Sequence, residues 1–239
     1  MGLLVYAAAA YASFLAVFLY LVGFLWNTGV PKGIDTGEPG PIVPALLVNL
    51  VLLALFGLQH SVMARPAFKR AWTAIVPEPA ERATYVLVSS LALALLMADW
   101  QPVPRVVWDT GLGRLSAALH ALSALGWLFT AASTFAIDHL HLFGLRQPLH
   151  AWLGRPRSGP EFRVRGPYHL VRHPLMLGFL VAFWSTPRMS LGHLEFALAM
   201  TLYIHLALAH EERDLRAAFG PLYDSYAART PRLNPFARR

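Results

Sequence analysis

The chain contains no cysteine and few charged residues. Of its 239 residues, 14% are charged and 56% are hydrophobic. The absence of cysteine excludes disulfides, cysteine–metal sites and a cysteine nucleophile, and it leaves the redox compartment undetermined. Soluble domains usually carry about a quarter charged residues, so the shortage of charge favours a membrane protein.

The hydrophobic residues are gathered in long segments, which predict an all-α fold. We expect a polytopic membrane bundle of about six apolar helices, with an amphipathic helical tail at the C-terminus. The apolar segments are 3–26, 42–64, 83–100, 115–137, 174–186 and 189–210. A helix needs about 20 apolar residues to span a bilayer, so the fifth segment is short. We expect the fifth and sixth segments to form a hairpin that turns at 186–190. The alternative for the fifth segment is a re-entrant or interfacial helix.

The distribution of positive charge predicts the orientation. Loops 65–82 and 138–172 and the tail after residue 210 are rich in arginine, whereas loops 27–41 and 101–114 are not. Basic loops stay on the cytoplasmic side, which places both termini there, in a bacterial inner membrane. The same rule explains the net charge of +7 without a nucleic-acid partner.

The domain organisation follows from these segments. We expect a single integral membrane domain over 1–239, with a four-span bundle in 1–137 and a ligand-binding loop, hairpin and tail in 138–239. Loop 138–172 is predicted to contain a short interfacial helix near 145–153. The tail shows helical spacing of apolar residues, and Gly220-Pro221 is expected to divide it into two helices.

Two polar clusters lie at the ends predicted for the hairpin. Residues 165–178 read Arg-Gly-Pro-Tyr-His-Leu-Val-Arg-His-Pro-Leu-Met-Leu-Gly, and residues 210–214 read His-Glu-Glu-Arg-Asp. Charges near hydrocarbon are costly and often functional. Free amides at a helix start, together with Arg172, would suit an anion such as a carboxylate. Interfacial arginines and an exposed acidic turn are the alternatives.

Other polar residues are expected at the same membrane face. Gln59, His60 and Ser61 end the second apolar segment, and Asp138 and His139 follow the fourth. Histidine exchanges protons near neutral pH, so these residues are candidates for acid–base chemistry. Helix capping and interfacial placement are the alternatives. No histidine pair has metal-ligand spacing, and no metal is expected.

The motifs resemble those of a known enzyme superfamily. Residues 172–178 look like the Arg-His-Pro-x-Tyr-x-Gly motif of the isoprenylcysteine carboxyl methyltransferase and phospholipid methyltransferase superfamily, with Met176 in place of Tyr. Glu211-Glu212 resembles the paired glutamates of this superfamily. The stretch from Phe219 to Tyr226 resembles the aromatic tail that follows them. Segments 56–66, 76–82 and 133–139 are similar to bacterial methanethiol S-methyltransferases, a sequence type also labelled nitrite-reduction-associated membrane proteins.

The resemblance implies a function. It is methylation of methanethiol, a small volatile thiol, by S-adenosylmethionine at the cytoplasmic face, giving dimethyl sulfide and S-adenosylhomocysteine. A different acceptor (a larger thiol, a carboxylate or an amine lipid) and a non-catalytic membrane protein are the alternatives. Carried onto this chain, the cofactor-binding residues are Tyr168, Arg172, His173, Leu175, Gly178, Glu211 and Glu212. The candidate catalytic residues are His60, Asp138 and His139, with His60 the first candidate base, and the substrate-binding residues are Gln59, Ser61 and Arg146.

Overall fold

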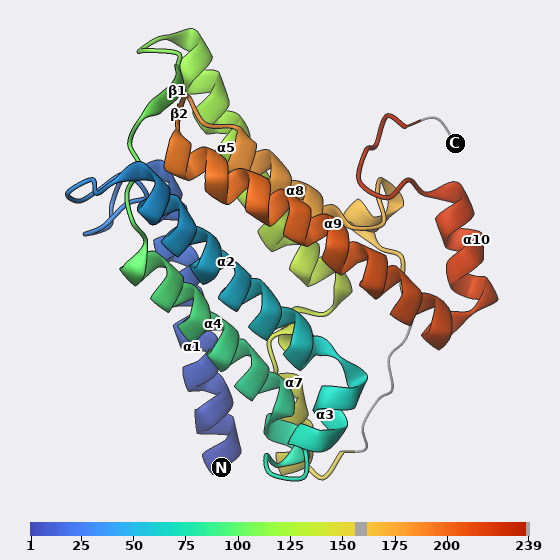
Figure 1. The fold of residues 1–239 in the computed structure, drawn as a ribbon. Helices are drawn as coiled ribbons and strands as arrows, with labels where there is room; N and C mark the ends of the chain where they lie inside the picture. The colour runs from blue at the N-terminus through green and yellow to red at the C-terminus, as the bar shows by residue number, and fades with distance from the viewer. Residues whose placement is uncertain (156–161, 238–239) are drawn as a thin grey trace. The chain divides into compact units, whose positions relative to one another are not determined.

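The computed structural model describes residues 1–155 and 162–237, most of them in helices (Figure 1). Part of the basic loop 138–172 therefore lies outside the described residues. Two compact units make up the chain. The first contains Met1–Val106, Leu140–Ser158 and Ser190–Phe196, and the second contains Val107–His139, Gly159–Met189 and Ala197–Arg239.

Three long apolar helices form the frame of the first unit. They are α1 (Gly2–Trp26), α2 (Ile42–Ala64) and α4 (Glu81–Asp99), and α4 packs against both of the others. Small side chains let α1 and α4 approach closely, because the buried Ala7 and Ala10 meet Ala83. The Tyr6 hydroxyl donates a hydrogen bond across the same contact to Thr84 Oγ1 at 2.9 Å.

Short helices complete the first unit. α3 (Pro66–Trp72) follows α2, and η1 (Glu78–Ala80) precedes α4. α6 (His139–Leu142) leads into α7 (Arg146–Trp152). Gly144 has φ of 77° and lies against the Ala83 backbone, so only glycine fits there without strain. The helix predicted near 145–153 is present as α7.

A close helix pair organises the second unit. It consists of α5 (Arg114–Ile137) and α8 (Pro174–Trp184), preceded by η2 (Gly166–His169). Side-chain hydroxyls bond across the pair to backbone carbonyls: Ser123 Oγ donates to the Ala182 oxygen at 3.0 Å, and Thr130 Oγ1 donates to the Leu175 oxygen at 3.2 Å. The pairing shows that α8 begins level with Thr130, before the C-terminal end of α5 at Ile137.

The long helix α9 (Leu191–Phe219) starts in the first unit and continues in the second. It extends nine residues beyond the predicted end at residue 210, so residues 211–219 of the predicted tail belong to this helix. The predicted break at Gly220-Pro221 is confirmed. Gly220 adopts φ of 51° and α10 (Pro221–Arg229) begins directly after it.

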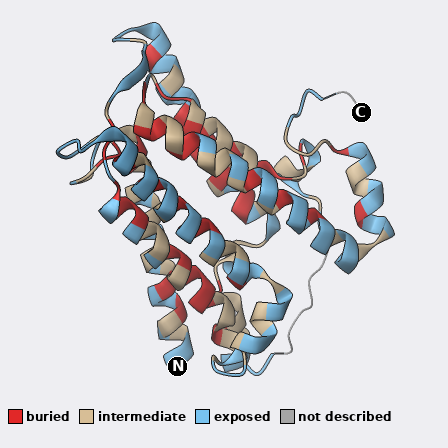
Figure 2. Cartoon of the chain, viewed as in Figure 1, coloured by how far each residue is buried: buried red, intermediate tan, exposed pale blue. Residues whose placement is uncertain are grey.

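The prediction of a polytopic helical membrane protein is confirmed. The helices α1, α2, α4, α5 and α9 are long and apolar enough to cross a membrane, whereas α8 has only 11 residues. Many residues along these helices are exposed (Figure 2). On α2 the exposed face is apolar along one stripe, formed by Leu47, Val51, Leu55 and Leu58, each at least 50% exposed. Such a stripe suits contact with lipid, and the protein is an integral membrane protein.

A small sheet departs from the all-α expectation. It pairs β1 (Val106–Asp109) with β2 (Arg188–Ser190), where a tight hairpin turn at 186–190 was predicted. In the second unit the pairing is extended by Thr110, whose amide donates to the Pro187 oxygen at 2.9 Å. Because α8 ends early, the chain has to continue in extended form before α9 begins, and its exposed backbone groups need partners.

Candidate active site

The segment before α8 is joined to the C-terminal tail through its backbone. The Arg172 amide donates to the Pro231 oxygen at 2.9 Å, and the His173 amide donates to the Arg232 oxygen at 3.2 Å. These two bonds place the Arg-His-Pro motif beside the residues that follow α10. The tail is therefore part of the site.

A buried carboxylate lies at the centre of the cluster. Glu212 Oε1 accepts from Arg172 Nε at 2.9 Å and lies 2.8 Å from Arg172 Nη2 and 3.2 Å from His173 Nε2. The three side chains are 13% exposed or less. Hydrogen bonds between ionised groups are stronger than neutral ones, so this arrangement fixes α9 to the start of α8.

Arg172 also binds the end of α10. Its Nη1 donates to the Ala227 oxygen at 2.8 Å and the Thr230 oxygen at 3.0 Å. A guanidinium commonly satisfies the last carbonyls of a helix in this way. Most of the Arg172 hydrogens therefore already have protein acceptors.

Two charged groups beside this cluster remain accessible. The Glu211 side chain is 50% exposed, with Oε2 3.7 Å from His173 Nδ1, and the Arg232 side chain is 34% exposed. Arg232 Nε lies 3.6 Å from Glu212 Oε1, but its Nε and Nη2 make no hydrogen bond among the described residues. A buried donor without an acceptor is rare and calls for a ligand or water.

This donor set fits S-adenosylmethionine, which carries a carboxylate, an ammonium group and ribose hydroxyls. Arg232 would take the carboxylate, and Glu211 the ammonium or a hydroxyl. Arg232 is not among the site residues predicted from the sequence. Its signal was weak, because it is one of several arginines in a basic tail, 20 residues from the paired glutamates.

Aromatic side chains lie next to these groups. The Phe162 ring is 5.3 Å from Phe219 and 5.6 Å from Tyr226, and Tyr223 is 6.1 Å from Tyr226. The Tyr226 hydroxyl donates to the backbone oxygen of Tyr168 at 2.7 Å, which attaches α10 to η2. Rings grouped in this way suit a purine or a cationic sulfur.

Burial favours the neutral forms of His173 and of three tyrosines in and beside the cluster. Burial lowers the pKa of His173, although the carboxylates of Glu211 and Glu212 oppose that shift. Burial raises the pKa of Tyr168, and it raises the pKa values of Tyr223 and Tyr226 to about 12. At neutral pH His173 is an uncharged imidazole and the three phenols remain hydrogen-bond donors.

Leu175 and Gly178 lie on the packed face of α8. A Cβ at Gly178 would meet Thr130 Oγ1 and would lie 2.7 Å from the Gly126 oxygen. The structure therefore explains this glycine by close helix packing, and its predicted cofactor contact stays a prediction. The Leu175 carbonyl is similarly engaged by Thr130.

Asp138 and His139 follow the end of α5 in the same unit, and both are half-buried. His139 Nδ1 lies 2.7 Å from Thr134 Oγ1, and its ring stacks on Phe135 at 4.1 Å. Burial lowers the pKa of His139, so the imidazole is available as a proton acceptor at neutral pH.

The first candidate base belongs to the first unit. His60 Nε2 lies 2.7 Å from the Tyr85 hydroxyl, and His60 Nδ1 lies 3.1 Å from Ser89 Oγ. Gln59 Nε2 is within 3.4 Å of the same serine oxygen, so α2 brings Gln59 and His60 into one polar network with α4. A neutral imidazole accepts at one nitrogen and donates at the other, and this network suits that form.

The other two residues predicted to bind substrate lie on different helices. Ser61 is half-buried on α2, and Arg146 lies on α7, where it lines a cavity of the first unit. Within 1–155 and 162–237, His, Asp and Glu side chains form no group of three or more suited to a metal ion.

Comparison with known proteins identifies the family. The family model described as "NnrU protein" matches residues 48–194. The chain belongs to the NnrU family. It is 54% identical, over 100% of its length and 93% of the relative, to methanethiol S-methyltransferase 2 of Bradyrhizobium diazoefficiens. It is 49% identical to methanethiol S-methyltransferase of Mycobacterium tuberculosis, over 99% of this chain and 97% of the relative.

The family reaches beyond bacteria. Nurim of Rattus norvegicus is 34% identical over 73% of this chain and 70% of the relative. No solved structure matches the chain significantly. The resemblance to methanethiol S-methyltransferases, predicted from the motifs, is confirmed by relatives that align over almost the whole chain.

Proposed function

We propose that this protein methylates methanethiol with S-adenosylmethionine and releases dimethyl sulfide and S-adenosylhomocysteine. One observation carries the proposal: the Arg-His-Pro motif and Glu212 form one buried cluster, and the charged groups of Glu211 and Arg232 beside it remain accessible. The cluster occurs in a chain 54% identical to a methanethiol S-methyltransferase. The proposed location is the bacterial inner membrane, with both termini in the cytoplasm.

The cofactor would supply an activated methyl group on a positively charged sulfur. In this proposal Arg232, with Arg172 behind it, binds the carboxylate, and Glu211 binds the ammonium or a ribose hydroxyl. The rings of Phe162 and Tyr226 hold the adenosine, and the buried ring of Tyr223 packs against both of them. Glu212 acts by orienting Arg172 and His173, because it already bonds to both.

The acceptor has to lose its proton, since the thiolate and not the thiol is the effective nucleophile. As the S–CH3 bond to the acceptor forms, the sulfonium C–S bond breaks and opposite charges cancel. A dry, apolar surrounding therefore suits the reaction. His60 is the proposed base, because both of its ring nitrogens lie within 3.1 Å of hydroxyl groups that keep it oriented.

Incubation of purified protein with methanethiol and methyl-labelled S-adenosylmethionine tests the function. We expect labelled dimethyl sulfide in the headspace, and little product from larger thiols, carboxylates or amine lipids in the same assay. Product from one of those acceptors alone would reassign the substrate. Failure to bind S-adenosylmethionine in calorimetry would remove the enzymatic proposal altogether.

Two variants separate binding from chemistry. Arg232→Gln is expected to weaken cofactor binding at least tenfold, because a charge-assisted contact contributes about 1.5 to 3 kcal/mol. His60→Ala is expected to reduce kcat about 100-fold with little change in cofactor affinity. Equal kcat in His60→Ala and the unmodified enzyme would exclude His60 as the base.

A further inference from the structure

Hydroxyl groups of the first unit enclose the proposed base. His60 Nε2 lies 2.7 Å from the Tyr85 hydroxyl, and His60 Nδ1 lies 3.1 Å from Ser89 Oγ. Tyr85 is 7% exposed and Ser89 is 9% exposed, so both hydroxyl groups belong to buried residues. Methyl transfer to a thiol releases one proton in each turnover. A base in these surroundings needs a route by which that proton leaves.

A cation lies over the tyrosine of this network. The guanidinium carbon of Arg82 is 5.0 Å from the centre of the Tyr85 ring, and Arg82 Nε donates to the Leu142 oxygen at 2.7 Å. The centre of the His60 ring is also 5.0 Å from that of Tyr85. A proton on His60 adds a second positive charge near Arg82, and repulsion between the two charges favours its release.

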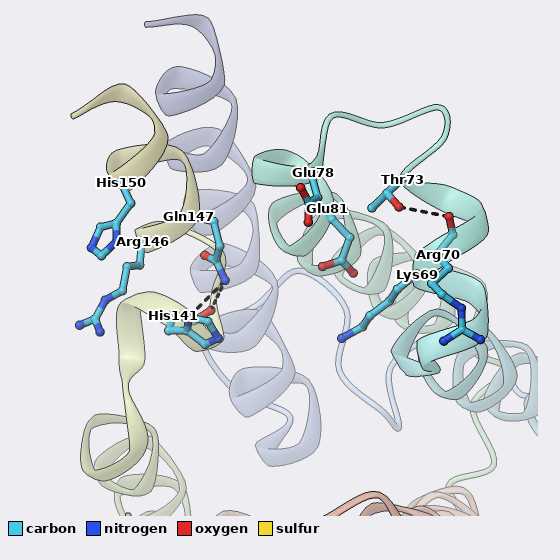
Figure 3. Close-up of a pocket in the computed structure, with 9 residues that line it drawn as sticks. All are labelled: Lys69, Arg70, Thr73, Glu78, Glu81, His141, Arg146, Gln147 and His150. Carbon is cyan, nitrogen blue, oxygen red and sulfur yellow. Dashed lines mark hydrogen bonds between the residues drawn. The ribbon is translucent and has the colours of Figure 1, made fainter. Parts of the chain in front are cut away.

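A polar cavity of about 330 Å³ lies in the first unit, where α4 begins (Figure 3). All nine side chains that line it are polar or charged, and Figure 3 shows them in two groups. Glu81 and Lys69 belong to the same group, which comes from α3, η1 and the start of α4. A polar cavity of this size has room for several water molecules. It is therefore suited to receive a proton.

Tyr85 lies one helical turn from this cavity. Glu81 lines the cavity and precedes Tyr85 by four residues on α4, and residues four apart are neighbours on a helix surface. Burial and the charge of Arg82 lower the pKa of Lys69 on the cavity wall, and the carboxylate of Glu81 opposes that shift. Ser89 lies one turn further along α4. The route through Tyr85 is therefore the shorter one.

We propose that the proton taken up by His60 leaves through Tyr85 to water in this cavity, and that Glu81 receives it there. The inference rests on the proposed function, because His60 has to accept the proton of the thiol. Tyr85 acts through His60 and is assigned no contact with either substrate. Arg82 holds the Tyr85 ring in place and repels the proton from His60.

The transfers along this route leave His60 and Tyr85 neutral. The thiol S–H bond breaks as His60 gains a proton, and the sulfur forms the new S–CH3 bond while the sulfonium C–S bond breaks. His60 Nε2 then gives a proton to the Tyr85 oxygen as the Tyr85 hydroxyl proton passes to water. The Glu81 carboxylate takes that proton and releases it to bulk water. One proton leaves for each methyl group transferred.

Removal of each hydroxyl group beside His60 tests the direction of the route. Tyr85→Phe is expected to lower kcat at least about tenfold and to leave the KM for methanethiol within about twofold. Ser89→Ala is the matched comparison, since it removes the other hydroxyl that contacts His60, and its kcat should fall less than about threefold. Circular dichroism and calorimetric affinity for S-adenosylmethionine show whether both variants are folded. A larger loss of kcat in Ser89→Ala would overturn the assignment to Tyr85.

Rescue by an added buffer separates proton removal from a structural role of the carboxylate. Glu81→Gln is expected to lower kcat about tenfold at low buffer concentration, and millimolar imidazole should restore most of it by accepting the proton from water. The kcat of the unmodified enzyme should not depend on imidazole. Glu38→Gln is the control, because Glu38 is an exposed carboxylate elsewhere in the same unit, and its kcat should be unchanged.

The outcomes distinguish this inference from the proposed function. If the unmodified protein forms no dimethyl sulfide, both are overturned. If it forms dimethyl sulfide and either Tyr85→Phe or Glu81→Gln keeps the full kcat, only the proton route is overturned. A lowered kcat in Glu81→Gln that imidazole does not restore would also overturn the route, since the carboxylate would then act on structure alone.

Discussion

Adjacent glutamates have different surroundings in this protein. Glu212 is buried and lies within 3.6 Å of Arg172, His173 and Arg232, whereas half of the Glu211 side chain is exposed. The helical rotation of about 100° between neighbouring residues turns Glu212 into the cluster and Glu211 away from it. Sequence alone treated both as cofactor ligands, but their contacts favour a positioning role for Glu212.

Substitution of the two glutamates should separate these roles. We expect Glu212→Gln to lower the free energy of unfolding by about 3 kcal/mol, because it leaves a buried guanidinium without its counter-charge. Glu211→Gln should leave stability within about 0.5 kcal/mol and weaken cofactor binding. Denaturant unfolding in detergent and calorimetry measure the two effects, and equal destabilisation by both variants would contradict this division.

The buried imidazole of His173 should make the cluster sensitive to acid. Its folded pKa lies below the usual 6.5, so below that pH the unfolded chain binds more protons than the folded protein. Stability is therefore complete above pH 6.5 and falls with decreasing pH, by at most about 1.4 kcal/mol per pH unit for one group. Denaturant unfolding at pH 7.5 and 5.5 measures this loss of stability, which should be smaller in His173→Gln than in the unmodified protein. An equal loss in the two proteins would show that other groups cause the pH dependence.

At the scale of helices, the site depends on the close packing of α5 and α8. Small and hydroxyl-bearing residues face one another along the pair, and this pattern lets two backbones approach and bond through side chains. The sequence showed Gly178 as part of a motif, but its partner Gly126 had no motif to indicate it. Only the three-dimensional pairing shows why both positions are glycine.

Substitution of Gly126 tests the helix pair. In Gly126→Ala the added Cβ would lie 2.7 Å from the Ala182 nitrogen and 2.8 Å from the Gly178 oxygen, and both are backbone atoms that cannot rotate away. We expect a loss of about 1 to 3 kcal/mol in stability and reduced activity. Gly40→Ala is the control, because no atom lies within 4 Å of that position, and thermal unfolding of the two variants should differ clearly.

At the scale of the whole molecule, α8 is too short to cross a membrane, although its apolar segment was predicted to be one of about six apolar helices. Its 11 residues are about 16 Å long, about half of a hydrocarbon core. Since α8 begins level with Thr130 of α5, the Arg-His-Pro motif lies alongside α5 and not beyond its end. Buried charges there need the partners that α9 and the tail provide.

The absence of cysteine makes membrane topology directly measurable. Ala71→Cys and Arg155→Cys lie in the basic loops, and Leu112→Cys lies in a loop with little positive charge, with all three positions exposed. We expect a membrane-impermeant maleimide to label Leu112→Cys in intact cells. The other two should react only after the membrane is permeabilised. The reverse labelling pattern would invert the orientation predicted from charge.

Much of the fold was readable from local sequence. The apolar segments predicted the long helices because hydrocarbon requires continuous runs of apolar residues, and Gly220-Pro221 predicted the break between α9 and α10. The short sheet was missed, since its strands have only four and three residues and lie at least 79 positions apart in the chain. The continuation of α9 to Phe219 was also missed, because its polar end resembles a tail.

The sequence by itself determined that the protein is helical and membrane-embedded, and its motifs indicated the methyltransferase resemblance. The tertiary structure decided which motif residues meet: Arg172, His173 and Glu212 in one buried cluster, with Arg232 added from the tail. The physical reason is that apolar periodicity is a local property that each helix carries alone. A polar cluster depends on contacts between segments 20 to 58 residues apart in the chain.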